Sequence, residues 1–244
     1  MFLLGKGIAQ SVSPEIHNDL LRKANLDYEY GLVDLERDQL PALIQRVKAE
    51  DIWGFNVTSP YKAEILNYLD SIDQRVEVLG AVNTVVQRAG KLYGYNTDVD
   101  GVRYAVKDLF EPGPILILGR GGAAKAAIYA FRDRELSVYC RDHSKDDELR
   151  RIKDDLRIVC DFNELEFGQA TNVIQATTVG FREDRSLLKE ALPGQKTLFD
   201  MIYTPWETSI MRNLKGSGVQ LKNGYEMVLG QAEKCFKLFS ENRI

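Results

Sequence analysis

Apolar residues along the chain gather in short runs that alternate with longer segments of helical period. Runs rich in apolar and β-branched residues predict strands at 2–4, 28–33, 53–57, 81–87, 91–95, 115–118, 136–140, 157–159, 172–176 and 197–200. Apolar residues spaced three and four apart predict helices at 13–24, 39–47, 60–69, 99–110, 123–132 and 225–239. Strands that alternate with helices form a largely parallel sheet covered by helices, so the pattern predicts an α/β fold.

Two breaks in the pattern refine this prediction. The strands at 81–87 and 91–95 are joined by Arg88-Ala89-Gly90, which predicts an antiparallel hairpin. After the helix at 99–110, Glu111-Pro112-Gly113-Pro114 interrupts the chain. The continuous apolar run Ile115–Leu118 that follows is typical of a buried parallel strand. A second unit therefore begins after the helix at 99–110.

The second unit opens with a glycine-rich loop, GRGGAAKA at 119–126, between the buried strand and a helix. Gly119 allows a tight turn, and Gly121 lets the backbone approach a pyrophosphate. Gly122 and Ala123 keep the helix start small, so that its N–H groups can hold phosphates. Arg120 lies between these glycines and belongs to the same predicted cofactor-binding loop. This strand–loop–helix context favours a Rossmann dinucleotide site over a glycine-rich connection without a ligand.

The end of the next strand bears on which dinucleotide is used. An acidic residue there accepts hydrogen bonds from the 2′-hydroxyl of NAD, whereas an arginine pairs with the 2′-phosphate of NADP. Arg141 and Asp142 are both present, and Lys145 can add a second cation. Arg141 lies nearer the strand end, so NADP is favoured and NAD stays possible.

A lysine in the first half is hard to explain by structure alone. In GFNVTSPYK at 54–62, Ser59 suits a helix N-cap and Pro60 the first helical position. Lys62 would then lie in the first turn, where a positive charge opposes the helix dipole. Lys62 is therefore a candidate for a reactive amine.

Three further polar clusters lie at turns and at element ends of the first half. Ser11 and Ser13 stand at a helix start, Asn83 at a strand start, and Asp98 just past a strand end. Ligands of parallel sheets bind beyond the strand ends, and these groups suit a small polyhydroxylated molecule. A lysine and an aspartate in contact could move a proton to or from an alcohol while a nicotinamide carries the hydride.

Composition excludes several other classes of function. The chain has 244 residues, 44% hydrophobic and 28% charged, with a net charge of −4. Without a basic excess, we expect no nucleic-acid partner. No apolar run reaches membrane-spanning length, so no membrane partner is expected. Three widely spaced cysteines indicate reduced thiols in the cytoplasm, and with only two histidines we expect no metal site.

Seven motifs spread over almost the whole chain carry a family resemblance. They are SVSPEIHN (11–18), GFNVTSPYK (54–62), GAVNT (80–84), GYNTD (94–98), GRGGAAKA (119–126), DMIYTP (200–205) and GYEMVLGQAEKCF (224–236). Together they resemble the shikimate dehydrogenase family. The resemblance implies NADPH-dependent reduction of 3-dehydroshikimate to shikimate, in aromatic amino acid (chorismate) biosynthesis. It also implies a substrate-binding domain at 1–99 plus 225–244 and a Rossmann domain at 100–224, with the C-terminal helix returning to the first domain.

The resemblance also implies a role for each matching residue. Lys62 and Asp98 match the catalytic pair, with Lys62 as the proton donor to the carbonyl oxygen. Ser11 and Ser13 match the serines that hold the substrate carboxylate. The remaining substrate-binding positions match Thr58, Asn83, Tyr203 and Gln231.

Departures from the family pattern lie mostly around the cofactor. Cys140 and Asp142 replace the usual Asn and Thr beside Arg141, and Gln175 replaces an Asn near the nicotinamide. Ser13 favours shikimate, since relatives that use quinate tend to have Thr there. The alternatives left open are a dehydrogenase for quinate or another shikimate-like polyol with NAD or NADP, and a non-catalytic nucleotide-binding paralogue. The expected oligomeric state is a monomer or a homodimer.

Overall fold

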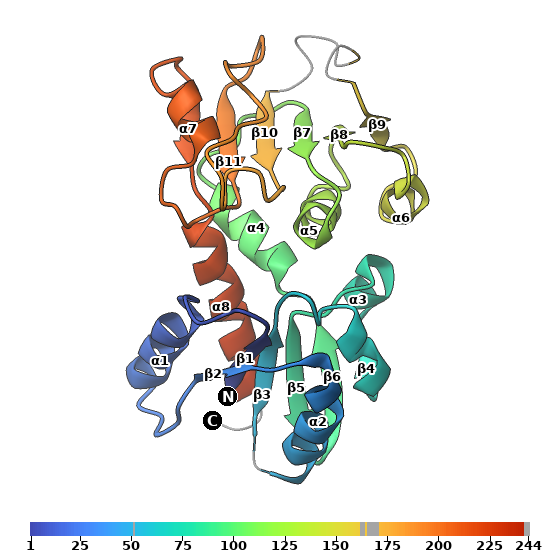
Figure 1. Ribbon diagram of the computed structural model, residues 1–244, viewed down its shortest axis with the longest axis vertical. Helices are drawn as coiled ribbons and strands as arrows, with labels where there is room; N and C mark the ends of the chain where they lie inside the picture. Colours follow the sequence, from blue (N-terminus) through green and yellow to red (C-terminus); the bar gives the residue numbers. More distant parts are fainter. Residues whose placement is uncertain (51, 162–163, 165–170, 242–244) are drawn as a thin grey trace. The chain divides into compact units, whose positions relative to one another are not determined.

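The computed structural model describes residues 1–50, 52–161, 164 and 171–241. These residues divide into two compact units. The first unit comprises Met1–Asp98 and the C-terminal stretch from Leu229, and the second comprises Val99–Val228. Each unit is built on its own sheet (Figure 1).

The sheet of the first unit is mixed. Its order is β2-β1-β3-β5-β6-β4. β1 pairs in parallel with β2 and β3, β4 pairs in parallel with β6, and β5 runs antiparallel to both β3 and β6. The predicted hairpin is confirmed, and Ala89 and Gly90 form its turn with φ of 49° and 75°. The strands are β1 (Phe2–Gly5), β2 (Gly31–Asp34), β3 (Gly54–Val57), β4 (Ser71–Ile72), β5 (Thr84–Arg88) and β6 (Lys91–Tyr95).

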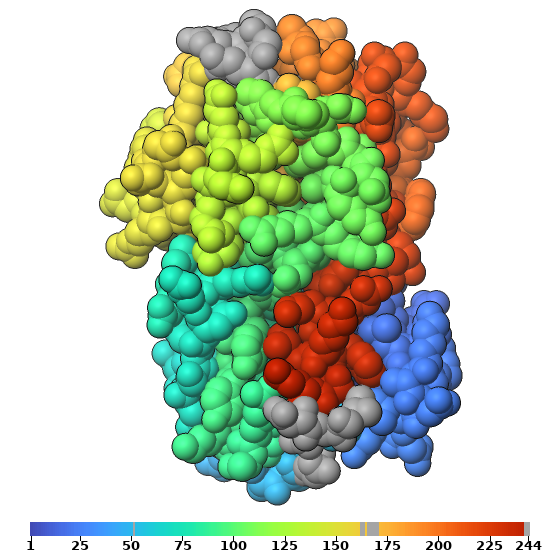
Figure 2. Space-filling view, turned by 180° about the vertical axis from the view of Figure 1, so that it is seen from behind, coloured from blue at the N-terminus to red at the C-terminus, as the bar shows by residue number. Residues whose placement is uncertain are grey.

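Helices cover both faces of this sheet, because side chains of successive strand residues point to opposite faces. Phe2 and Leu4 of β1 pack in a core with α2 and η2, whereas Leu3 packs in a second core with α1 and α8. Figure 2 shows the outer face of α8, in red, at the surface. The helical elements are α1 (Ser13–Lys23), η1 (Arg37–Gln39), α2 (Leu40–Ala49), η2 (Glu64–Tyr68), α3 (Gln74–Leu79) and, from Leu229 on, α8 (Tyr225–Ser240).

The sheet of the second unit is entirely parallel. Its order is β12-β11-β10-β7-β8-β9, which is the doubly wound order of a Rossmann fold. The order reverses at β7, the strand that precedes the glycine-rich loop. The strands are β7 (Ile115–Leu118), β8 (Leu136–Tyr139), β9 (Arg157–Val159), β10 (Asn172–Gln175), β11 (Thr197–Asp200) and β12 (Gln220–Lys222). The helices are α4 (Asp98–Val106), α5 (Gly122–Ala130), α6 (Asp146–Arg150) and α7 (Ser209–Leu214).

Some element boundaries differ from the predicted ones. The strand predicted at 28–33 begins only at Gly31, because the side chain of Asn18 takes the backbone groups of Tyr30. Asn18 donates to the carbonyl of Tyr30 and accepts from its N–H, both at 2.9 Å. The sequence reasoning did not find β4, α3, α7 and β12, although Asp73 caps α3 and Gly80 ends it at φ 63°.

None of the helices in the described part of the chain has the length and apolar character that a membrane span requires. Among the same residues, no cluster of three or more His, Cys, Asp or Glu side chains is arranged to hold a metal ion.

Candidate functional site

Lys62 lies in a turn rather than in the first turn of a helix. Its carbonyl oxygen accepts a hydrogen bond from the N–H of Val82 at 2.8 Å, and the N–H of Leu66 bonds the carbonyl of Ala63 at 3.3 Å. The 3₁₀ helix η2 therefore begins only at Glu64. The prediction of a helix from residue 60 is wrong, because a tertiary hydrogen bond takes the carbonyl that a helix would use.

Lys62 and Asp98 form a close ion pair. Nζ of Lys62 lies 2.6 Å from Oδ2 of Asp98, and their side chains are 27% and 12% exposed. Asp98 is the first residue of α4, where the helix dipole favours a negative charge. The pair therefore combines a charge-assisted hydrogen bond with an amine that still reaches solvent, and such an amine can exchange a proton with a ligand beside it.

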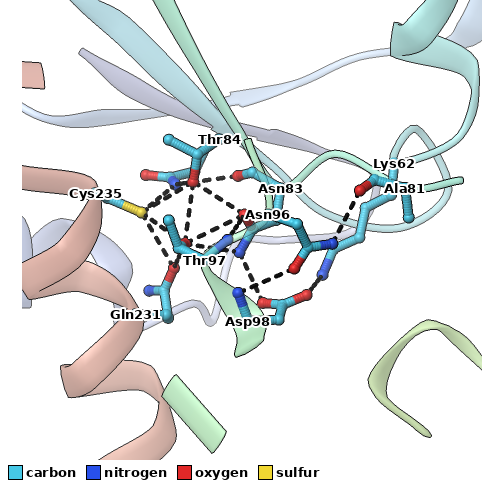
Figure 3. Close-up of polar contacts among 10 residues, drawn as sticks. Lys62, Ala81, Asn83, Thr84, Asn96, Thr97, Asp98, Gln231 and Cys235 are labelled. Carbon is cyan, nitrogen blue, oxygen red and sulfur yellow. Dashed lines mark hydrogen bonds and ion pairs between the residues drawn. The ribbon is translucent and has the colours of Figure 1, made fainter. Parts of the chain in front are cut away.

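Asn83 holds the other oxygen of this carboxylate. Its Nδ2 donates to Oδ1 of Asp98 at 2.7 Å and to Oγ1 of Thr97 at 3.0 Å. Its Oδ1 accepts from the N–H of Thr97 at 2.8 Å and from the hydroxyl of Thr84 at 3.0 Å. Asn83 is buried just before β5, so this network fixes the orientation of Asp98 (Figure 3).

A buried polar layer lies beneath Asn83. The Cys235 thiol of α8 contacts Nδ2 of Asn56 at 3.0 Å and the hydroxyls of Thr84 and Thr97 at 3.0 and 3.1 Å. Gln231, one turn earlier on α8, accepts from Thr97 at 3.5 Å and from Cys235 at 3.4 Å. Burial raises the pKa of the Cys235 thiol, which favours its neutral, hydrogen-bonding form.

Sequence reasoning missed four members of this layer, which are Asn56, Thr84, Thr97 and Cys235. All four stand inside the quoted motifs, next to or near residues that were singled out. Their partners lie far away in sequence, up to 179 residues for Asn56 and Cys235. Only their place within the motifs could have pointed to them.

Ser11 and Ser13 come together as expected at the start of α1. The hydroxyl of Ser11 donates to that of Ser13 at 3.1 Å, and the N–H of Ser13 donates to Oγ of Ser11 at 3.3 Å. Both residues are half-buried. Thr58 directly follows β3, and its N–H donates to the carbonyl of Leu4 at 2.9 Å. The adjacent hydroxyls of Ser11 and Ser13 can together bind one carboxylate.

The glycine-rich loop has the geometry that a pyrophosphate requires. Gly119 has φ 122°, and a Cβ there would lie 2.9 Å from the carbonyl oxygen of Ala176. Gly121 is the N-cap of α5, and no side chain caps this helix. Around Gly121 and Gly122 a Cβ would meet nothing within 4 Å. The first turn of α5, which includes Ala123, therefore has no side-chain cap and begins beside open space at Gly121 and Gly122, so the residues of the loop are compatible with a pyrophosphate there.

The loop after β8 carries the charged residues expected near an adenosine ribose. Arg141 and Lys145 are exposed, and neither forms an ion pair with another described residue. Asp142 does form one, because Nη2 of Arg120 donates to its Oδ2 at 2.8 Å. Figure 2 shows the segment of α6, in yellow, at the surface of the second unit. Sequence reasoning considered Asp142 as an acid that could favour NAD, and it did not identify Arg120 as its partner.

Two polar groups organise the loops after β10 and β11. The amide of Gln175 donates to the carbonyl of Val179 at 3.0 Å and accepts from the hydroxyl of Thr177 at 3.0 Å. Asp200 is buried and accepts from the hydroxyl of Thr208 at 2.5 Å, and its burial raises its pKa to about 6. Tyr203 follows in the same loop, half-buried, and burial raises the pKa of its phenol.

Comparison with known proteins agrees with these motifs. A family model described as the shikimate dehydrogenase substrate binding domain matches residues 3–85. The NADP(+) shikimate dehydrogenase of Nitrosopumilus maritimus is 33% identical over 249 residues, which cover 97% of this chain and 91% of that protein. The chain belongs to the shikimate dehydrogenase family. The resemblance inferred from the motifs is thereby confirmed.

Solved structures of the family share the fold. The shikimate dehydrogenase of Thermus thermophilus, in complex with NADP(H) and shikimate, has a TM-score of 0.90 at 31% identity, covering 98% of this chain and 92% of that one. The enzyme of Listeria monocytogenes, in complex with shikimate and NAD, has a TM-score of 0.87 at 30% identity, covering 99% and 91%. The predicted α/β fold with a Rossmann unit is confirmed, and the family includes complexes with either dinucleotide.

Proposed function

We propose that this chain is an NADP-dependent shikimate dehydrogenase, which reversibly reduces 3-dehydroshikimate to shikimate in aromatic amino acid biosynthesis. The observation that carries the proposal is the Lys62–Asp98 pair, fixed by Asn83. The reduction adds a hydride to the carbonyl carbon and a proton to the carbonyl oxygen. A bound NADPH supplies the hydride, so the protein has to supply the proton.

Lys62 is the group that donates this proton. Its ammonium is held at 2.6 Å from Asp98, and it is exposed enough to meet a carbonyl oxygen. Asp98 stabilises the ammonium and keeps Nζ in one place, because its second oxygen is held by Asn83. After the transfer, Lys62 regains a proton through its exposed side. In the reverse direction the same amine accepts the proton of the alcohol.

The remaining polar groups of the first unit bind the substrate. Ser11 and Ser13 would hold the carboxylate through their adjacent hydroxyls. Thr58, Gln231 and Asn83 would contact the ring hydroxyls, and Tyr203 of the second unit is a further substrate residue. Both Asn83 amide hydrogens already bond Asp98 and Thr97, so orienting Asp98 is the larger part of its role.

The two units divide the work. Residues 1–99 with 225–244 would bind the substrate, which the family match over residues 3–85 supports. Residues 100–224 would bind NADP, with the pyrophosphate held by the backbone of the loop formed by Gly119, Arg120, Gly121, Gly122 and Ala123. Arg141 and Lys145 would bind the 2′-phosphate, since both are exposed cations after β8.

The free thiols support a cytoplasmic location for the proposed enzyme. Cys140, Cys160 and Cys235 are all free in this structure, which suits a reducing cytoplasm. A monomer and a homodimer are equally compatible with the proposed reaction, and sedimentation of the purified chain would distinguish them.

The direct test is absorbance of the reduced nicotinamide, with shikimate or quinate each combined with NADP or NAD. We expect the largest kcat/KM with shikimate and NADP. A larger kcat/KM with quinate or another ring polyol would move the substrate assignment and keep the mechanism. A folded protein that binds NADP but turns over none of these substrates would favour a non-catalytic paralogue.

A further inference from the structure

Two loops meet at the edge of the second sheet where the dinucleotide is proposed to bind. Arg120 lies in the loop between β7 and α5, and Asp142 lies in the loop between β8 and α6 (Figure 1). β7 and β8 are parallel neighbours, with Leu118 opposite Tyr139. The two loops therefore leave the same edge of the sheet side by side.

The side chain of Arg120 binds the loop between β8 and α6 through several hydrogen bonds. Its Nη2 donates to Oδ2 of Asp142 at 2.8 Å, and its Nη1 donates to the carboxylate and, at 2.9 Å, to the backbone carbonyl of Asp142. Nη1 also donates to the hydroxyl of Ser144 at 2.8 Å, and the N–H of Ser144 donates to Oδ1 of Asp142 at 2.9 Å. The Arg120 guanidinium and Ser144 hold the pKa of the Asp142 carboxyl well below its usual range.

Asp142 occupies the place from which an acid would select NAD. In Rossmann folds an acidic residue after the second strand accepts hydrogen bonds from the ribose 2′-hydroxyl, and its charge disfavours a 2′-phosphate. Here both carboxylate oxygens already accept hydrogen bonds from Arg120, and one also accepts from Ser144. The pair is electrically neutral, so Asp142 no longer offsets the positive charges of Arg141 and Lys145 in this loop.

We propose that Arg120 masks Asp142, and that this masking lets the loop after β8 accept the 2′-phosphate of NADP despite its aspartate. Asp142 is then a carboxylate withdrawn from the ribose, and Arg120 acts through Asp142 rather than on the phosphate. The inference rests on the proposed function in taking a dinucleotide as the ligand.

The test is calorimetric titration with 2′,5′-ADP (adenosine 2′,5′-bisphosphate) and with 5′-AMP, which differ only in the 2′-phosphate and probe the adenosine site without turnover. Arg120→Ala should weaken 2′,5′-ADP about tenfold and leave 5′-AMP unchanged or tighter, because the exposed carboxylate then repels the 2′-phosphate. Asp142→Asn alone should bind 2′,5′-ADP at least as tightly as the wild type. The double variant Arg120→Ala/Asp142→Asn should return to within about twofold of the wild type, because no charge remains to be masked.

A matched control comes from the neighbouring ion pair. Nζ of Lys125 on α5 lies 2.6 Å from Oε2 of Glu148 on α6. Lys125→Ala breaks a link between the same two regions without unmasking Asp142, so the ratio of the two affinities should not change. Circular dichroism melts of every variant establish that each one is folded.

Three results would overturn the masking. An Arg120→Ala variant with an unchanged affinity ratio would do so directly. A double variant as weak as Arg120→Ala would mean that Arg120 binds the phosphate itself. A wild type that binds neither nucleotide would overturn the proposed function together with this inference, whereas the first two results leave the proposed function intact.

Discussion

Two cation–carboxylate pairs, one in each unit, differ in what lies behind them. The Lys62–Asp98 pair stands on a buried polar layer, in which Asn83, Thr97 and Cys235 all have little or no exposure. The Arg120–Asp142 pair lies at the surface, with side chains 21% and 51% exposed. Solvent screens the charges of the Arg120–Asp142 pair, so this pair contributes little to the stability of the fold. The buried polar layer behind the Lys62–Asp98 pair fixes the geometry of that pair. The roles proposed for the two pairs differ accordingly: proton transfer for Lys62–Asp98 and charge masking for Arg120–Asp142.

The largest effect should come from removing the amine of the first pair. Lys62→Ala should lower kcat by about 10²–10⁴, because the proton donor is lost, with a smaller change in KM. Steady-state kinetics with shikimate and NADP measure both constants. Lys48→Ala is the matched control, since Lys48 pairs with Asp70 in the same unit at 3.1 Å and should leave kcat unchanged. Unchanged kcat in Lys62→Ala would refute the assigned role.

The carboxylate of Asp200 differs from those of Asp98 and Asp142, because no cation among the described residues pairs with it. Burial raises the pKa of Asp200 to about 6. The folded state therefore binds a proton that the unfolded state has already released, so stability falls as pH rises from about 4 to 6. Two pKa units correspond to about 3 kcal/mol.

This dependence can be isolated with Asp200→Asn. Between pH 4 and pH 7 the free energy of unfolding of the wild type should fall by about 3 kcal/mol relative to the variant. Urea unfolding at several pH values measures the difference. Parallel pH profiles of the two proteins would mean that burial does not perturb this carboxyl.

The buried layer itself can be broken with one small change. Thr97→Val removes a hydroxyl that contacts Asn83, Gln231 and Cys235 while keeping the side-chain shape. We expect a loss of about 1–3 kcal/mol in the free energy of unfolding, because buried partners lose their hydrogen bonds. We also expect a several-fold fall in kcat, since Asn83 then holds Asp98 less firmly. A variant with lower stability and wild-type kcat would separate the layer from catalysis.

The smallest effect should come from removing a hydroxyl beside the exposed Arg120–Asp142 pair. Ser144→Ala removes one acceptor of Arg120, and solvent can replace it. The free energy of unfolding should change by less than about 0.5 kcal/mol, as is usual for surface substitutions. Thermal melts of Ser144→Ala and Thr97→Val, measured side by side, test whether the two pairs differ as described. Equal losses would contradict the distinction.

The local sequence pattern was enough to predict most strands and helices and the two glycine-containing turns discussed here. The Rossmann loop was predictable because its glycines and small residues are required by backbone geometry within one strand–loop–helix unit, as φ 122° at Gly119 illustrates. The hairpin at Ala89 and Gly90 was predictable for the same reason. Most strands and helices followed from hydrophobic periodicity, which reports which face of an element is buried. The family motifs then placed Lys62, Asp98 and the two serines in one protein class.

Only the tertiary structure decided how those residues are held. Lys62 was singled out because it would oppose a helix dipole, yet a hydrogen bond from Val82 keeps it outside any helix. The link between Thr84 and Cys235 spans 151 residues, and Arg120 meets Asp142 across neighbouring strands. Such contacts depend on which strands and helices become neighbours, and periodicity carries no information about that choice. The sequence by itself therefore determined most of the elements and the chemical groups, and the packing of distant segments decided which charges are paired or buried.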